Sequence, residues 1–145
     1  MTDYKNSGGI KVKMNLELAK SLINKAISQA ENMGIFCSVV VVDDKGFLVA
    51  AYRMDSALIP TLDIARDKAW TAAVFRTPSS EVNKYGDPSK ANAGFNTQNW
   101  NDRLTTIPGG LPVESAGKVI GSMGVSGGDP GEDVQVCRGA LEVLE

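Results

Sequence analysis

The sequence predicts a single α+β domain in which helices flank an antiparallel sheet. Strand-like runs follow one another around short turns, and they do not alternate strictly with helices as in a doubly wound fold. The length of 145 residues suits one domain with its own core. We place this domain at residues 14–145. Residues 1–13 are polar and contain glycine, so we expect them to form a flexible N-terminal arm.

Apolar residues at three-and-four spacing predict three helices. The first covers Leu16–Met33, because Asn15 can cap its start and Gly34 can end it. The second runs from about Pro60 to Phe75, with proline in its first turn. The third follows Asp129-Pro130-Gly131-Glu132, which has the pattern of a capping box. A short helix is also expected to start within residues 77–80.

Five strands are predicted. The run Ile35–Val42 is too continuously apolar for a strand with one wet face, so we expect it at the centre of the sheet. The turn at residues 43–46 then leads to a second strand, Phe47–Tyr52, which completes a hairpin. Weaker strand signals occur at Leu104–Ile107 and Leu111–Val113, and a strong one at Val119–Val125.

Composition excludes several functions. A net charge of −2 without a basic stripe argues against nucleic acid, and no apolar run reaches membrane-spanning length. The start of the chain lacks a signal-peptide pattern, so we expect no membrane partner and a cytoplasmic location. The chain has no histidine, which excludes histidine-ligated haem. Cys37 and Cys137 are far apart in apolar surroundings, so we expect buried thiols and no zinc site; the cofactor, if any, stays unknown.

Arginines near strand ends are candidate ligand-binding residues. Arg53 ends the first hairpin, where its guanidinium could clamp a carboxylate and Asp55 could orient it. Arg103 stands before the later strands, in the irregular segment Asn92–Arg103, which could form a specialised pocket. The alternative is that these arginines form ordinary surface ion pairs.

Glycine-rich loops add further candidates. In Pro108-Gly109-Gly110-Leu111-Pro112, the diglycine could approach a ligand while the prolines fix its flanks, although such a pattern is often only a tight turn. Gly109, Gly110 and Pro112 are therefore ligand-binding candidates. Ser126 and Gly127 lie where the last strand ends, and their amides could hold an anion. Gly121 and Gly124, by contrast, indicate close packing.

Any acid–base catalysis must proceed without histidine. Asp55 or Asp67 would act as the base, or Lys68 as a desolvated amine. Asp67 shares a helix face with Asp63, Arg66 and Trp70, and such a face is normally solvated. No metal-binding residues are predicted.

Several of these weak signals occur in a familiar order. The chain resembles the GlcG/HbpS-like family (haem-degrading domain, DUF336) over residues 14–144, and it is similar to the C-terminal domain of PduO-type corrinoid adenosyltransferases. The resemblance is carried by Val41-Val42-Asp43 with Gly46, Arg53-Met54-Asp55, Lys68-Ala69, Gly109-Gly110-Leu111-Pro112-Val113, Val119-Ile120-Gly121 and Gly124-Val125-Ser126-Gly127-Gly128.

The resemblance implies a five-stranded antiparallel sheet and assembly into a homo-oligomer. We expect the protein to act on a small anionic organic compound, as a binding protein or as a deaminase, hydrolase or isomerase of an unsaturated carboxylate. A haem- or tetrapyrrole-binding or redox-sensing module without a histidine ligand is the alternative, and an accessory partner of a larger enzyme is another.

Overall fold

The computed structural model describes residues 12–86, 89 and 101–144. The proposed arm at residues 1–11 and the segment 92–100 lie outside the described residues. The elements along the chain are α1 (Leu16–Met33), β1 (Ser38–Asp43), β2 (Leu48–Arg53), α2 (Pro60–Phe75), the 3-10 helix η2 (Ser79–Gly86), β3 (Gly110–Ser115), β4 (Lys118–Ser126), α3 (Pro130–Leu141) and the 3-10 turn η3 (Glu142–Leu144).

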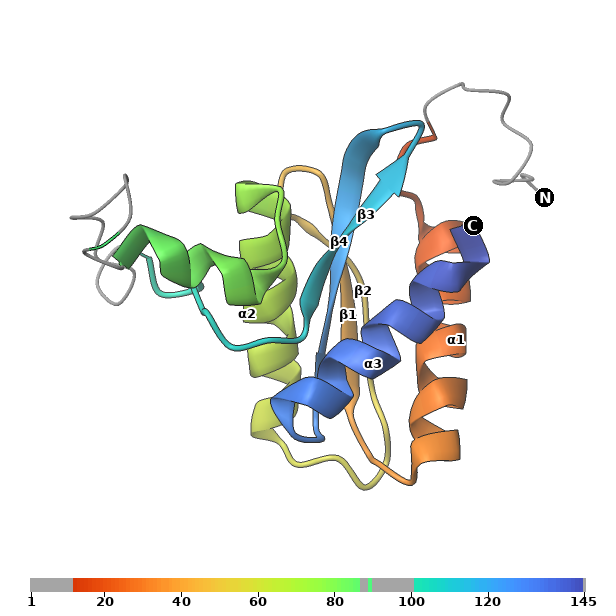
Figure 1. Ribbon diagram of the computed structural model, residues 1–145. Coiled ribbons are helices and arrows are strands. Elements are labelled where there is room, and N and C mark those ends of the chain that lie inside the picture. The colour runs from red at the N-terminus through yellow and green to blue at the C-terminus, as the bar shows by residue number, and fades with distance from the viewer. Residues whose placement is uncertain (1–11, 87–88, 90–100, 145) are drawn as a thin grey trace.

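The sheet is antiparallel and has the strand order β2-β1-β4-β3. Helix α2 covers one face, while α1 and α3 lie together on the other (Figure 1). The α+β class with helices on an antiparallel sheet is therefore confirmed. The expected count of five strands is wrong, because the described residues form a sheet of four.

The missing strand is Leu104–Ile107, where the backbone groups of Thr105 and Ile107 bond to side chains and the Leu104 N–H bonds to the Asn101 carbonyl. The Thr71 hydroxyl of α2 donates to the Arg103 carbonyl at 3.3 Å and accepts the Thr105 N–H at 3.0 Å. The Ser79 hydroxyl donates to the Ile107 carbonyl at 2.7 Å. These bonds hold the segment against α2 and η2, so it does not pair with the sheet.

Helix boundaries follow the sequence closely. The Asn15 side chain accepts the Leu18 N–H, and Gly34 ends α1 in a left-handed conformation. Asp129 and Glu132 form the expected capping box of α3. The short helix expected near residue 77 is present as η2. Local capping chemistry was therefore sufficient to place the ends of these helices.

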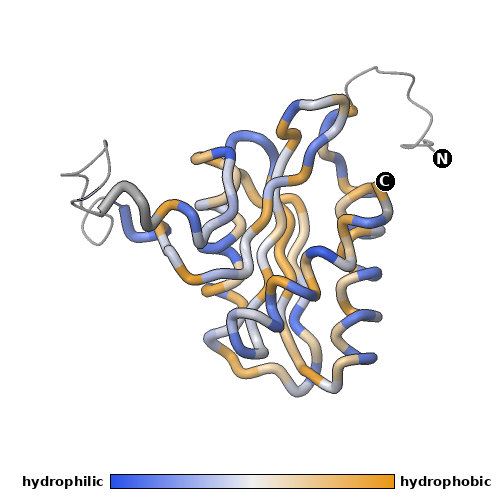
Figure 2. The backbone as a smooth tube through the Cα atoms, in the orientation of Figure 1, coloured by the Kyte–Doolittle hydropathy of each residue, from blue (hydrophilic) through white to orange (hydrophobic). Residues whose placement is uncertain are grey.

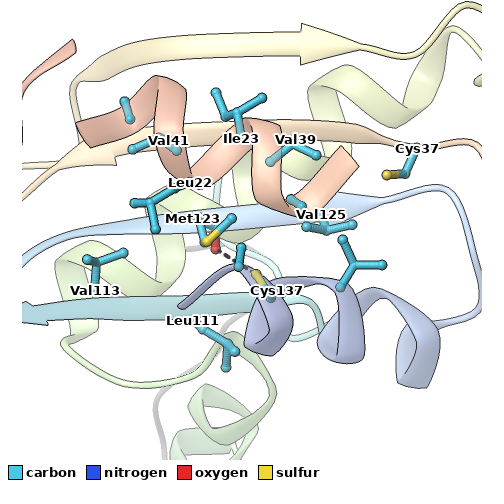
Figure 3. Close-up of a cluster of buried hydrophobic side chains, with 14 of the residues drawn as sticks. Leu22, Ile23, Cys37, Val39, Val41, Leu111, Val113, Met123, Val125 and Cys137 are labelled. Atoms are coloured by element: carbon cyan, nitrogen blue, oxygen red, sulfur yellow. Dashed lines mark hydrogen bonds between the residues drawn. The ribbon is translucent and has the colours of Figure 1, made fainter. Parts of the chain in front are cut away.

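The core has two layers, one on each face of the sheet. The larger lies between the sheet and α1 with α3, and it includes Val39, Val41 and Met123 (Figure 3). The smaller joins Val40 and Val42 to the alanines of α2. The strands between the helices are largely apolar, whereas the side of α1 that points away from the sheet is hydrophilic (Figure 2). Strand β1 is thus buried on both faces, as its sequence predicted.

Two glycines of β4 lie where neighbouring backbone approaches closely, Gly124 under α2 and Gly121 beside β1. A methyl group at Gly124 would collide with the Ala65 carbonyl of α2, and one at Gly121 with the Val42 carbonyl. Close packing at these two glycines is confirmed. Strand β4 lies between β1 and β3, so both of its edges pair within the sheet.

Candidate functional site

Lys68 extends from α2 past the end of β4 to α3, where its ammonium group is fully buried. Lys68 Nζ lies 3.0 Å from Asp133 Oδ2 and donates to the Val125 carbonyl at 2.8 Å. The second Asp133 oxygen accepts the Gly128 N–H at 2.9 Å. Lys68 and Asp133 are 1% and 2% exposed, so this ion pair is screened from water. It connects the two helical layers of the protein.

Burial dominates the electrostatics of this centre. It raises the pKa of Asp133, although the hydrogen bond and charge of Lys68 and the backbone bonds of Gly128 and Gly127 act in the opposite direction. Burial also raises the pKa of the nearby Cys137 thiol, against the effect of the Lys68 charge. Cys137 Sγ donates to the Gly109 carbonyl at 3.4 Å. These groups are packed together as a solvent-free polar cluster.

The diglycine passes directly beside Lys68. A methyl group at Gly109 would lie 2.8 Å from Lys68 Nζ, and one at Gly110 would collide with the Lys68 carbonyl. Both glycines are buried. Their lack of side chains therefore makes room for the lysine, and neither faces one of the surface depressions described below.

Two other charged candidates, Arg53 and Arg103, lie near different turns of α2. Arg53 is opposite Ser38, which contacts Thr61 near the start of the helix, and Arg53 Nη1 donates to the Ala57 carbonyl. The Arg103 backbone is bonded to Thr71, ten residues further along, which is about 15 Å on a helix axis. The structure does not bring these two arginines to one small pocket.

Asp67 lies near Arg103 and is half-buried. Its pKa is raised first by burial and then by Asp63, while Arg66 and Arg103 lower it. Asp55 is exposed in the loop after β2. Asp55, Asp67 and Lys68, the expected catalytic residues, thus occupy three different environments.

Ser126 and Gly127 lie at the end of β4 that adjoins the diglycine, since Gly110 pairs with Gly124 and Val125 donates its N–H to the Gly109 carbonyl. Ser126 is buried opposite Ser38 of β1. A methyl group at Gly127 would collide with the Phe36 carbonyl. Close packing thus accounts for this glycine, and neither residue lines one of the depressions.

The described residues form several surface depressions, and three of them have volumes between about 340 and 550 Å³. One, of about 550 Å³, is called here the Arg138 groove, and its lining consists of Pro78, Leu111, Pro112, Glu114, Arg138, Leu141 and Glu142. A second, of about 430 Å³, is lined by Ile27, Glu31, Phe36, Met54, Asp55 and Ser56. The third, of about 340 Å³, is lined by Lys13, Met14, Asp43, Asp44, Lys45 and Ile120. Pro112 and Asp55 are the only expected site residues among these linings.

Sequence reasoning missed Asp133 and Arg138. Asp133 follows the capping residue Glu132 in the first turn of α3, where acidic residues are common, so its type alone does not mark it out. Its partner Lys68 is 65 positions away, and no local pattern shows such a pair. Arg138 has no neighbouring motif, and it becomes part of a groove only because β3 and Pro78 lie near α3.

Donor atoms for metals are sparse. Within residues 12–86, 89 and 101–144, no three histidine, cysteine or acidic side chains gather closely enough to hold a metal ion. The Met54 thioether already accepts the Cys37 N–H at 3.3 Å and lies 3.8 Å from the Cys37 sulfur. No helix of this described part is long and apolar enough to cross a membrane.

Comparisons with known proteins agree with this fold. A 15.0 kDa protein of Citrobacter freundii, from the dhaT-dhaS intergenic region, is 33% identical over 89% of this chain and 90% of its own length. The crystal structure of Klebsiella pneumoniae ORFY superposes with a TM-score of 0.83 at 28% identity, covering 93% of both chains. A complex of PduOC with haem also gives 0.83, at 26% identity, covering 92% of this chain and 96% of that one. The model of the family described as haem degrading protein HbpS-like matches residues 14–142, and with these relatives it places the chain in that family.

Proposed function

We propose that this protein binds a small, largely apolar organic carboxylate in the Arg138 groove. The observation that carries the proposal is the guanidinium of Arg138 beside an apolar wall. No ion pair within the described residues engages Arg138. Leu111, Pro112 and Leu141 supply apolar surface around it. Two acids, Glu114 and Glu142, also line the groove, so an amphipathic anion would be held by Arg138 and by the apolar walls against the repulsion of these carboxylates.

The other two depressions lack an arginine, and so lack a bidentate partner for a carboxylate. Asp55 and Glu31 line the second without a cationic residue, so they would repel a carboxylate. The third contains two aspartates beside its two lysines, and one of these aspartates, Asp43, accepts the N–H groups of Lys45 and Phe47. The Arg138 groove is also the largest of the three.

Binding alone is proposed, and not catalysis. Lys68 is buried and paired with Asp133, and Asp55 and Asp67 lie outside the Arg138 groove. A deaminase, hydrolase or isomerase would need an acid or base in contact with its substrate. Glu114 and Glu142 are the titratable acids that line this groove.

The proposal is tested by calorimetric titration with a panel of saturated and unsaturated mono- and dicarboxylates. Arg138→Leu should abolish binding, and Arg138→Lys should weaken it several-fold, because lysine keeps the charge but loses bidentate pairing. Arg53→Lys and Arg103→Lys serve as matched controls outside the groove. Binding that survives Arg138→Leu, or that is lost with either control, would place the ligand elsewhere.

Haem is the second candidate ligand, because a family relative is known as a complex with haem. The described residues offer a poor fit for its iron: the chain has no histidine, and no sulfur lines the Arg138 groove. Haem also carries carboxylates, for which Arg138 is a suitable partner. We therefore propose that any tetrapyrrole is held by its carboxylates and its apolar faces.

Titrating haemin and metal-free protoporphyrin in parallel separates these modes. Recognition through carboxylates predicts similar affinities for both, with no sharp low-spin spectrum for haemin. A saturable one-to-one haemin complex with a low-spin spectrum, and no binding of the metal-free ring, would show that iron coordination dominates.

A further inference from the structure

The Arg138 groove carries charges of both signs. Arg138 lies on α3, Glu142 follows it by four positions at the end of this helix, and Glu114 belongs to β3. All three side chains are exposed. Because two acids stand against one base, the charged lining is net negative. A ligand with a carboxylate as its only charge gains one favourable contact here and meets two unfavourable ones.

The protein does not neutralise these three charges itself. In the part of the chain that the structure describes, Lys68 and Asp133 form the only ion pair. Arg138 and Glu142 have the spacing at which helical side chains of opposite charge can pair, yet they do not pair with each other. The groove therefore keeps one partner for an anion and two partners for a cation.

The backbone of β3 adds a hydrogen-bond acceptor to this lining. Val125 donates its N–H to the Gly109 carbonyl, so Gly109, Leu111 and Val113 turn their backbone groups towards β4. By the alternation of a strand, the Pro112 carbonyl turns away from β4. Pro112 lines the groove and has no N–H. Its backbone thus offers a ligand an acceptor and no donor, which suits an ammonium group.

Apolar side chains make up the rest of the lining. Leu111 and Leu141 come from the same two elements as the charges, and Pro78 and Pro112 add surface that loses no rotamer freedom on binding. The volume of about 550 Å³ lies in the range of small-molecule sites. The apolar part of a ligand can therefore lie on this wall while its charged groups meet the charged side chains.

We propose that the ligand of the Arg138 groove is an apolar α-amino acid. This inference rests on the proposed function and adds a cationic group to the carboxylate. The ligand carboxylate pairs with Arg138, and its ammonium group pairs with Glu142 and Glu114. Since four residues advance about 6 Å along a helix axis, the partners of Arg138 and Glu142 must lie close together on the ligand. The two charged groups of an α-amino acid are attached to one carbon atom and meet this condition.

Matched pairs of ligands test the second charge. Phenylalanine differs from 3-phenylpropanoate by its ammonium group, and leucine differs from 4-methylpentanoate in the same way. Calorimetric titration of the full-length chain at pH 7 should show tighter binding of the amino acid in each pair. If the plain carboxylates bind as tightly or more tightly and still require Arg138, this inference is wrong and the proposed function stands. If no member of either pair binds, the inference is wrong whatever the other carboxylates do.

Substitution of the acids should have effects of opposite sign on the two ligand types. Glu142→Gln and Glu114→Gln keep the side-chain size but remove a negative charge. Each should weaken phenylalanine binding by about two- to fivefold, which is what an exposed ion pair contributes. Each should leave 3-phenylpropanoate binding unchanged or stronger, because a repulsion is lost.

Glu17→Gln is the matched control, since Glu17 is an exposed acid of α1 outside the groove. It should change neither affinity. Unchanged phenylalanine binding in both groove variants, or an equal loss of both ligands in them, would overturn the inference. A loss of phenylalanine binding in Glu17→Gln would do the same.

Discussion

Lys68 and Asp133 form an ion pair between helices that lie on opposite faces of the sheet, with 3.0 Å between Nζ and Oδ2. The pair passes the end of β4, where the Val125 carbonyl accepts a second bond from the lysine. Breaking one side of such a pair leaves the other charge buried without its partner. The stability of the whole layer arrangement therefore depends on both residues.

We expect Lys68→Met to lower the free energy of unfolding by about 3–5 kcal/mol, because it leaves the Asp133 carboxylate buried and unpaired. The double variant Lys68→Met with Asp133→Leu should recover much of this loss, since neither charge is then present. Urea denaturation of the two variants measures the difference. If Lys68→Met alone lowers the free energy of unfolding by less than about 1 kcal/mol, water reaches the ion pair.

Gly124→Ala should destabilise the protein by about 1–3 kcal/mol or more, because the added methyl group collides with the Ala65 carbonyl. Gly131→Ala is the matched control. A methyl group there meets only Asp129 Oδ1, at 3.4 Å, within the first turn of α3. Alanine should raise helix stability at this position by several tenths of a kcal/mol. Thermal unfolding measures the stability of both variants. If Gly124→Ala and Gly131→Ala change it equally, the close packing of α2 on β4 is contradicted.

Burial raises the pKa of Cys37 from 9.0 to about 11. We expect neither native thiol to react with a disulfide reagent at pH 8, and both to react in urea. Between pH 9 and 11 the unfolded chain loses the Cys37 proton while the native protein keeps it, so stability should fall as pH rises. Cys37→Ala should show a smaller fall in this window. Rapid labelling of the native protein would contradict the burial of these sulfurs.

The sequence predicted the helices because their ends depend on local chemistry. The cap at Asn15, the left-handed Gly34 and the capping box at Asp129 each act within a few residues. The false strand at Leu104–Ile107 failed for the opposite reason. The backbone groups of this segment bond to the hydroxyls of Thr71 and Ser79, which are distant in sequence, and local patterns do not show such bonds.

The candidate site was predicted less well than the fold. The sequence singled out Lys68 as a desolvated amine, and the structure does bury it. It could not show that Asp133 neutralises this charge, since the pairing depends on how α2 and α3 are placed around β4. Nor could it show Arg138 beside Pro112, because that contact forms only when β3 lies next to α3.

The strand order also determines how the chain must fold. The sheet consists of two hairpins, β1–β2 and β3–β4, each closed by a short turn. They meet only along β1 and β4, whose paired residues Val40 and Gly124 are separated by about 80 residues. Helix α2 lies between the hairpins in sequence and packs on both of these strands. Joining the hairpins therefore requires a long loop to close, and we expect this late docking step to limit the folding rate.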